Sequence, residues 1–229
     1  MRRRALLLVP LAGCAAPPRP STQAPPTELL PADRPPGGRL WQADVAASRL
    51  RILAFRAGSL ARLGHHHILQ AQRFEAQLWL PAQGLQGAQG GLRVRLDDLE
   101  LDRPEWRAAA GGEFNEKPVD AEAIAATQLN LLRALRAQQH PEVRVQLLSL
   151  HGAAPWWQAE LRLWLAGQAA DYWVALQVQA EDERLQLRGA LVLQHQGHGL
   201  APFSLPAGLL SVQDAVQLDF ELVLRASAP

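Results

Sequence analysis

The chain has 229 residues, of which 48% are apolar, and its 23 basic and 22 acidic residues leave a net charge of +1. This length suits one sizeable domain, and the apolar fraction is high enough to fill a core. The near-zero charge gives no sign of a nucleic-acid partner or of an acidic substrate. Seven tryptophans accompany a single tyrosine, and tryptophan suits cores and barrel mouths because it is large, apolar and carries one donor.

Residues 1–13 have the pattern of an export signal. Three arginines precede a short apolar run from Ala5 to Leu11, which is too short to cross a bilayer. The segment Leu11-Ala12-Gly13-Cys14 resembles a bacterial lipobox and holds the only cysteine of the chain. This resemblance implies cleavage before Cys14, acyl chains such as palmitate on it, and an outer-membrane anchor facing the periplasm, because Ala15 rather than Asp follows. An ordinary signal peptide with a chance cysteine is the alternative.

Residues 15–38 carry eight prolines and end in Pro35-Pro36-Gly37-Gly38. This composition disfavours helices and sheet ladders, so we predict that residues 14–38 are a lipidated cysteine followed by a disordered, semi-extended linker. The folded domain is predicted over residues 39–227. With Cys14 as the only cysteine, the domain has no disulfide and depends on its core alone.

From Arg39 onward, apolar and polar residues mostly alternate, which is the strand pattern. A helical spacing interrupts it from Val119 to Ala137, and His140-Pro141 ends that segment. The fold class is therefore all-β with one accessory α-helix, as a closed antiparallel barrel of about eight strands or a sandwich. The alternating runs are residues 40–46, 48–55, 73–80, 92–97, 143–147, 157–165, 172–179, 185–194 and 216–225.

Three stretches in chain order resemble the YceI-like family. Residues 59–67 are similar to a subgroup with a Gly-His-x-His sequence, residues 127–145 to the family's helix and following strand, and residues 194–216 to its last loop and strand. The resemblance covers residues 41–226. It implies a lipocalin-like barrel with an accessory helix in an exported bacterial protein, and some members hold a long isoprenoid chain in the barrel.

The three consecutive histidines, His65, His66 and His67, are the main cluster of polar residues in the predicted domain. On a strand, His65 and His67 point to one side and His66 to the other. The pair has three interpretations: a hydrogen-bonded barrel rim, a metal or haem site, or a contact to a ligand headgroup. A metal site needs a third ligand. Candidates for that ligand are His198, His195 and His151.

A second prediction concerns the inward face of the strands. If the barrel is hollow, its lumen holds one small or chain-like ligand, and a filled core is the alternative. The predicted lining residues are Leu50, Ile52, Phe74, Leu78, Val94, Leu161, Leu163, Leu187, Leu191, Phe220 and Leu222.

The acidic run of Asp97, Asp98, Glu100 and Asp102 is interpreted as a solvated strand end and turn. No nucleophile elbow, phosphate loop or thiol is visible in the folded domain, so no enzymatic activity is predicted.

The sequence thus favours a lipoprotein of the bacterial envelope, held to the membrane by an N-terminal acyl anchor. Its barrel is expected to bind or carry a long apolar ligand, an isoprenoid or other lipid, without chemical turnover. The alternatives are a metal- or haem-binding protein that uses His65 and His67, and a purely structural lipoprotein. Composition leaves the oligomeric state open.

Overall fold

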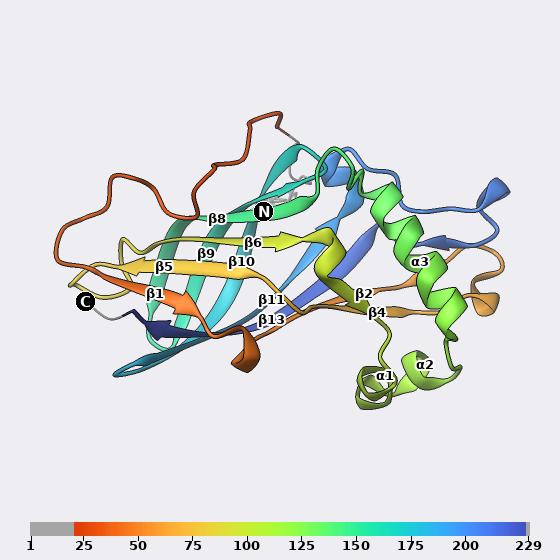
Figure 1. The fold of residues 1–229 in the computed structure, drawn as a ribbon, viewed down its shortest axis with the longest axis horizontal. Coiled ribbons are helices and arrows are strands. Elements are labelled where there is room, and N and C mark those ends of the chain that lie inside the picture. The colour runs from red at the N-terminus through yellow and green to blue at the C-terminus, as the bar shows by residue number, and fades with distance from the viewer. Residues whose placement is uncertain (1–20, 228–229) are drawn as a thin grey trace, which may run out of the picture.

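The computed structural model describes residues 21–227, and its main element is a closed antiparallel barrel of eight strands (Figure 1). Each strand pairs with the next, and pairing of the first with the last closes the ring. In ring order the strands are β1 (Arg39–Ala43), β5 (Glu75–Leu80), β6 (Gln89–Arg95), β8 (Glu142–Ala153), β9 (Trp156–Leu165), β10 (Gln168–Glu181), β11 (Arg184–Gln194) and β13 (Ala215–Ala226). The predicted lipocalin-like barrel is confirmed.

At one end the barrel continues into a second set of strands, because β13 is longer than its partner β1. Residues 217–221 of β13 pair with β2 (Arg49–Ala54) instead. A short 3-10 turn at Val45–Ala47 separates β1 from β2, and Asp44 caps it by accepting the Ala47 N–H at 3.3 Å. The sheet then extends through β4 (His67–Ala71) and β7 (Leu99–Leu101).

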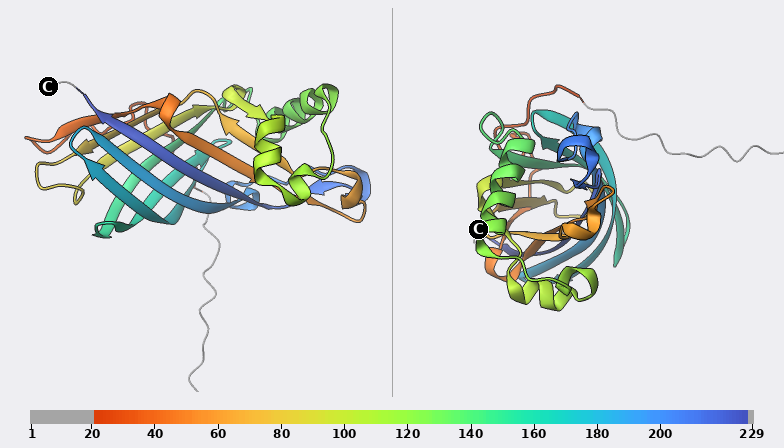
Figure 2. Two further views of the ribbon diagram at one scale, coloured as in Figure 1. Left: turned by 90° about the horizontal axis from the view of Figure 1, so that it is seen from below. Right: turned by 90° about the vertical axis from the view of Figure 1, so that its right-hand side faces the viewer.

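Three helices lie between β7 and β8. They are α1 (Pro104–Ala110), α2 (Gly112–Asn115) and α3 (Ala121–Ala134). The view along the barrel in Figure 2 (right) places α3 beside the open end of the ring. None of the helices within residues 21–227 is both long and apolar enough to cross a bilayer.

The predicted helix over residues 119–137 is α3, shortened at both ends. It begins after Asp120, whose carboxylate accepts the Ala123 N–H at 2.8 Å as an N-cap. It ends at Ala134, shortly before Arg136, which has a φ of 54° that a helix does not allow. The helices α1 and α2 were not predicted, because seven and four residues are too few to show a helical period.

The part of the predicted linker that the structure describes is not detached from the domain. Residues 21–38, here called the N-terminal strap, run along the outer wall beside β8 before entering β1 (Figure 1). Ser21 exchanges two backbone hydrogen bonds with Ala169. Arg144 donates to the carbonyl of Thr27 at 2.8 Å, and Trp164 to that of Gln23 at 2.8 Å. The composition correctly excludes regular elements here, but the backbone carbonyls still find donors on the wall. Residues 14–20 lie outside the described residues.

Gly91 on β6 is where the strap comes closest to the wall. A Cβ atom at this position would clash with the Leu29 carbonyl oxygen. We expect Gly91→Ala to push the strap off β6, because the added methyl group would meet the Leu29 backbone and no flexible side chain can move aside. Cleavage after Glu28 by a glutamate-specific protease should become several-fold faster, while the barrel stays folded. Arg95→Ala, an exposed position on the same strand, is the control, and equal cleavage rates for the two variants would contradict the expectation.

Candidate functional site

The barrel encloses a cavity of about 640 Å³. Side chains of β5, β6, β8, β9, β10, β11 and β13 line it, and so do β2, β4 and one face of α3. The lining is predominantly leucine, with valine, alanine and phenylalanine between. This follows from the alternation in the sequence, since every second residue of each strand faces inward. A cavity of this size and character is typical of a small-molecule binding site.

The residues predicted to line the lumen face the inside of the barrel, with one exception. All of them except Phe74 line the cavity. Phe74 lies in the break between β4 and β5, so its side chain packs into the adjacent core and is 8% exposed. The alternative of a completely filled core is therefore wrong for the described barrel.

The polar end of the cavity is built around His67, the first residue of β4. His65 and His67 both line the cavity, while the ring of His66 turns to the other side, as strand parity predicted. The His67 Nδ1–H donates to Oδ2 of Asp102 at 2.6 Å. This bond fixes the ring so that its other nitrogen, Nε2, is free to meet a ligand.

Asp102 is held in turn by buried donors. Its Oδ1 accepts the Ile68 N–H at 2.9 Å and Nη1 of Arg107 at 2.8 Å. The side chains of Asp102 and Arg107 are 0% and 5% exposed. Burial raises the pKa of Asp102, but the hydrogen bonds from His67, Ile68 and Arg107 outweigh it and hold the pKa below its ordinary value.

The interpretation of the acidic run as a solvated turn is wrong for Asp102. The other three carboxylates pair with arginines near the surface, for example Asp97 with Arg95 at 2.7 Å. Asp102 instead turns inward at the end of β7 and binds His67, which is 35 residues away in sequence. A local pattern cannot show a partner at this distance, so the buried Asp102 and Arg107 were missed.

His65 is the second histidine at the cavity. Burial lowers the pKa of His65, and the neighbouring His67 and Arg107 lower it further. The rings of His65 and His67 lie with their centres 6.3 Å apart. Together the two rings give the predominantly apolar cavity a polar end that can hydrogen-bond a ligand's polar group.

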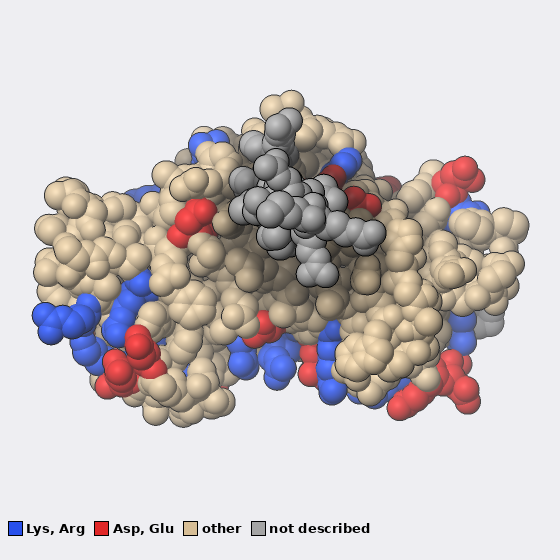
Figure 3. All heavy atoms as spheres, turned by 180° about the vertical axis from the view of Figure 1, so that it is seen from behind, with Lys and Arg blue, Asp and Glu red and all other residues tan. Residues whose placement is uncertain are grey.

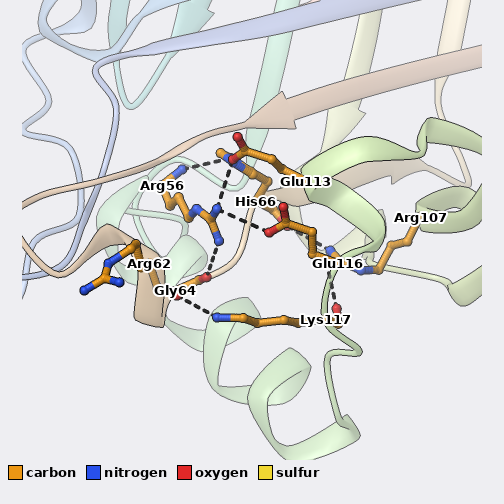
Figure 4. A network of polar contacts seen from close by, with 8 residues as sticks. All are labelled: Arg56, Arg62, Gly64, His66, Arg107, Glu113, Glu116 and Lys117. Carbon is orange, nitrogen blue, oxygen red and sulfur yellow. Dashed lines mark hydrogen bonds and ion pairs between the residues drawn. The ribbon is translucent and has the colours of Figure 1, made fainter.

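His66 belongs to a separate network on the outer side of the same segment (Figure 4). Its Nδ1 accepts the Arg56 N–H at 3.3 Å, so its Nε2–H donates to Glu113 on α2 at 2.7 Å. Arg56 also binds Glu113, at 2.9 Å, and the carbonyl of Gly64, at 3.0 Å. These contacts fasten the segment before β4 to α2 and thereby set the position of His65 and His67.

The structure does not bring the predicted third ligand to the histidine pair. His198 is fully buried, and its two ring nitrogens bind the Tyr172 hydroxyl at 2.9 Å and the Gln168 carbonyl at 3.1 Å. Nδ1 of His195 binds the carbonyl of Asp214 at 2.7 Å. Within residues 21–227, no three His, Cys, Asp or Glu side chains are grouped so as to hold a metal ion. Cys14, the predicted acylation site, lies outside the described residues.

Comparison with known proteins gives matches in structure only. No protein-family model matches the chain, and no curated protein matches its sequence. The crystal structure of BcnA from Burkholderia cenocepacia superposes with a TM-score of 0.56 at 12% identity, over 79% of this chain and 98% of BcnA. A YceI protein from Campylobacter jejuni superposes with a TM-score of 0.50 at 9% identity, over 70% of this chain and 85% of that protein. At these identities the likeness shows the fold, which agrees with the family that the three sequence stretches resemble.

Proposed function

We propose that this chain, which has the fold of the YceI proteins, binds one long apolar molecule with a small polar end and holds it without chemical turnover. An isoprenoid or another lipid fits this description. The observation that carries the proposal is the cavity of about 640 Å³, lined by apolar side chains from nearly every strand. Each methylene group that moves from water into such a lining contributes about 0.8 kcal/mol, so a long chain gains affinity along its length.

The histidine pair supports a defined orientation of the ligand. With Nδ1–H of His67 donated to Asp102, Nε2 is left to accept a hydrogen bond from a hydroxyl group on the ligand. A few placed polar groups in an apolar cavity are what fixes the orientation of a ligand. In this proposal the His67–Asp102 pair serves binding, because Asp102 holds the His67 ring in a fixed orientation at the cavity.

The proposal includes export and acylation at Cys14, which rest on the sequence pattern of residues 1–14. The strap is fixed to the wall from Ser21 onward. The chain between Cys14 and Ser21 therefore spans at most about 25 Å when fully extended. An acyl anchor at Cys14 would thus keep the barrel close to the outer membrane, within reach of lipids. A metal site on His65 and His67 is not proposed, because within residues 21–227 no third His, Cys, Asp or Glu side chain is grouped with them to hold an ion.

Native mass spectrometry of the full chain, purified from its own cell envelope, tests the proposal. We expect a bound lipid mass on the wild-type protein. In Leu191→Trp the larger side chain enters the cavity and should remove that mass while the fold is kept, because the added ring fills existing space. Val192→Trp is the matched control, since Val192 is the next residue of β11 and is 59% exposed on the outside. A bare wild-type chain, or equal lipid occupancy in both variants, would contradict the proposal.

A further inference from the structure

Two loops at one end of the molecule carry large apolar side chains that water contacts freely. One loop precedes β4, and the other precedes β12 (Ser211–Val212). We call their four exposed leucines the leucine rim. They are Leu60 (42% exposed), Leu63 (70%), Leu205 (44%) and Leu209 (44%). A group of exposed large apolar residues on a folded protein marks an interaction surface.

The two loops hold each other in place, so the leucine rim has a defined structure. The Leu60 N–H donates to the carbonyl of Leu209 at 2.7 Å. The short strands β3 (Arg56–Ala57) and β12 pair at the base of the loops. Gly58 has a φ of 95°, and a Cβ atom there would lie 2.6 Å from the Gly208 carbonyl oxygen, so only glycine permits this approach.

The leucine rim is continuous with the cavity. Leu63 and Leu205 belong to the rim and also line the cavity, as does Leu210 beside them. His65, at the polar end of the cavity, follows Leu63 by two residues. The rim leucines therefore connect the apolar lining of the cavity to the surface, beside the histidine pair.

Basic side chains border the leucine rim. Neither Arg62 nor Lys117 forms an ion pair within the described residues, and Lys117 Nζ donates to the carbonyl of Arg62 at 2.6 Å. The nearby carboxylate of Glu113 is paired with Arg56 and His66. Figure 4 shows the Arg62 guanidinium directed away from this network. In Figure 3 this end of the molecule, at the left, shows few Lys, Arg, Asp or Glu side chains, and most of those lie toward its lower border.

We propose that the leucine rim docks on the surface of an anionic lipid bilayer, so that the apolar ligand passes between bilayer and cavity without entering water. The leucines would enter the headgroup region, and Arg62 and Lys117 would meet lipid phosphates. This inference rests on the proposed function, because it assigns the ligand's entrance. Charge complementarity and continuity with the cavity distinguish a bilayer from a protein partner.

A fluorescent probe on the rim tests docking directly. The full chain with Cys14→Ser has no other cysteine, so Leu63→Cys can be labelled alone with an environment-sensitive dye. Vesicles of phosphatidylethanolamine with a minority of phosphatidylglycerol should shift its emission to the blue, and spin-labelled lipids should quench it. The same probe at Val192→Cys on the barrel wall should respond little. Adding Leu60→Gln and Leu209→Gln should abolish the response at position 63, and Arg62→Gln should reduce its dependence on the anionic lipid.

The outcomes separate docking from ligand binding. Equal quenching at positions 63 and 192 would overturn the docking inference. A dye response that grows with protein concentration in the absence of vesicles would overturn it too, because it would show that the rim binds a second copy of the chain. Uptake of a fluorescent isoprenoid analogue in solution is measured on the same samples. Uptake without rim insertion would leave the proposed function intact and remove only the docking inference. Rim insertion without uptake by any sample would contradict the proposed function and leave only the contact between the leucine rim and the bilayer.

Discussion

Replacing Arg107 with methionine is expected to destabilise the fold by about 3–5 kcal/mol, because it leaves the carboxylate of Asp102 buried without its cationic partner. The side chain of Asp102 is 0% exposed, so water cannot replace the lost donor. Arg107 also donates to the carbonyl of His66 at 2.8 Å, which adds a second unsatisfied acceptor. Chemical denaturation of the full chain near neutral pH measures the loss.

Two further variants identify the buried charge as the cause. Arg103→Met removes an arginine four residues earlier whose side chain is 43% exposed and pairs with Glu100, and it should cost no more than about 1 kcal/mol. The double variant Arg107→Met with Asp102→Asn removes both buried charges and should recover a large part of the loss. Asparagine suits this position because Asp102 has a φ of 52°, which asparagine tolerates. A double variant as unstable as the sum of the two single variants would contradict the explanation.

The pH dependence of this effect has a definite sign. The pKa of Asp102 is lower in the folded state than its ordinary value of 3.8. Its contribution to stability is therefore present above about pH 3.8 and is lost as the pH falls through the lower folded value. In Arg107→Met the carboxyl has lost a donor and takes up a proton more readily. The deficit relative to wild type should therefore shrink in acid.

The barrel was predictable because it depends on a local signal. Alternation along β9 to β13 fixes which side chains face inward, and each hairpin strand finds its neighbour nearby in sequence. The same parity placed Leu50, Leu163 and Phe220 at the cavity. Phe74 differed because a break between β4 and β5 interrupts the alternation, and one irregular residue is enough to change which way a side chain points.

The site was predictable only in part, since its contacts join distant segments. Strand parity separated His65 and His67 from His66, which the structure reproduces. No local pattern indicated that Asp102 would bind His67 or that Arg107 would in turn bind Asp102. The contacts of the strap were missed for a related reason. Its backbone carbonyls accept hydrogen bonds from Arg144 and Trp164. Because every residue type has a carbonyl, the sequence of the strap does not mark these contacts.

His198 is expected to make the fold less stable as the pH falls below about 6.5. His198 is the last residue of a short 3-10 turn, His195–His198, and it is 0% exposed and bonded to Gln168 of β10. Since the Gln168 carbonyl can only accept, Nδ1 carries the proton, and the neutral Nε2 accepts from the Tyr172 hydroxyl. Burial lowers the pKa of His198, the Gln168 carbonyl partly offsets this, and the charge of His195 lowers the pKa further. Burial disfavours the charged form of Tyr172 as well, which here raises its pKa to about 12, so the hydroxyl stays protonated.

Stability falls as the pH falls here because the unfolded state binds protons more readily than the folded state. The unfolded histidine binds a proton near its ordinary pKa of 6.5, whereas the folded one resists it. The stabilisation is thus complete above pH 6.5 and is lost as the pH falls toward the lower folded value. The loss caused by His198 therefore begins at a higher pH than the loss caused by Asp102, which begins only below about pH 3.8. The free energy of unfolding, measured by denaturant titration at a series of pH values, should decrease in an upper step that begins near pH 6.5 and decrease further below about pH 3.8.

A matched pair of variants assigns the upper step. His198→Asn keeps a short amide that can donate to the Gln168 carbonyl but cannot titrate, so the slope of stability against pH below 6.5 should flatten. His151→Asn, at an exposed position in β8, should leave the slope unchanged. Because the pKa of His65 is also lowered, a smaller slope should remain in His198→Asn and disappear when His65→Asn is added. An unchanged slope in His198→Asn would show that the buried ring is not its source, whatever that variant does to the stability at neutral pH.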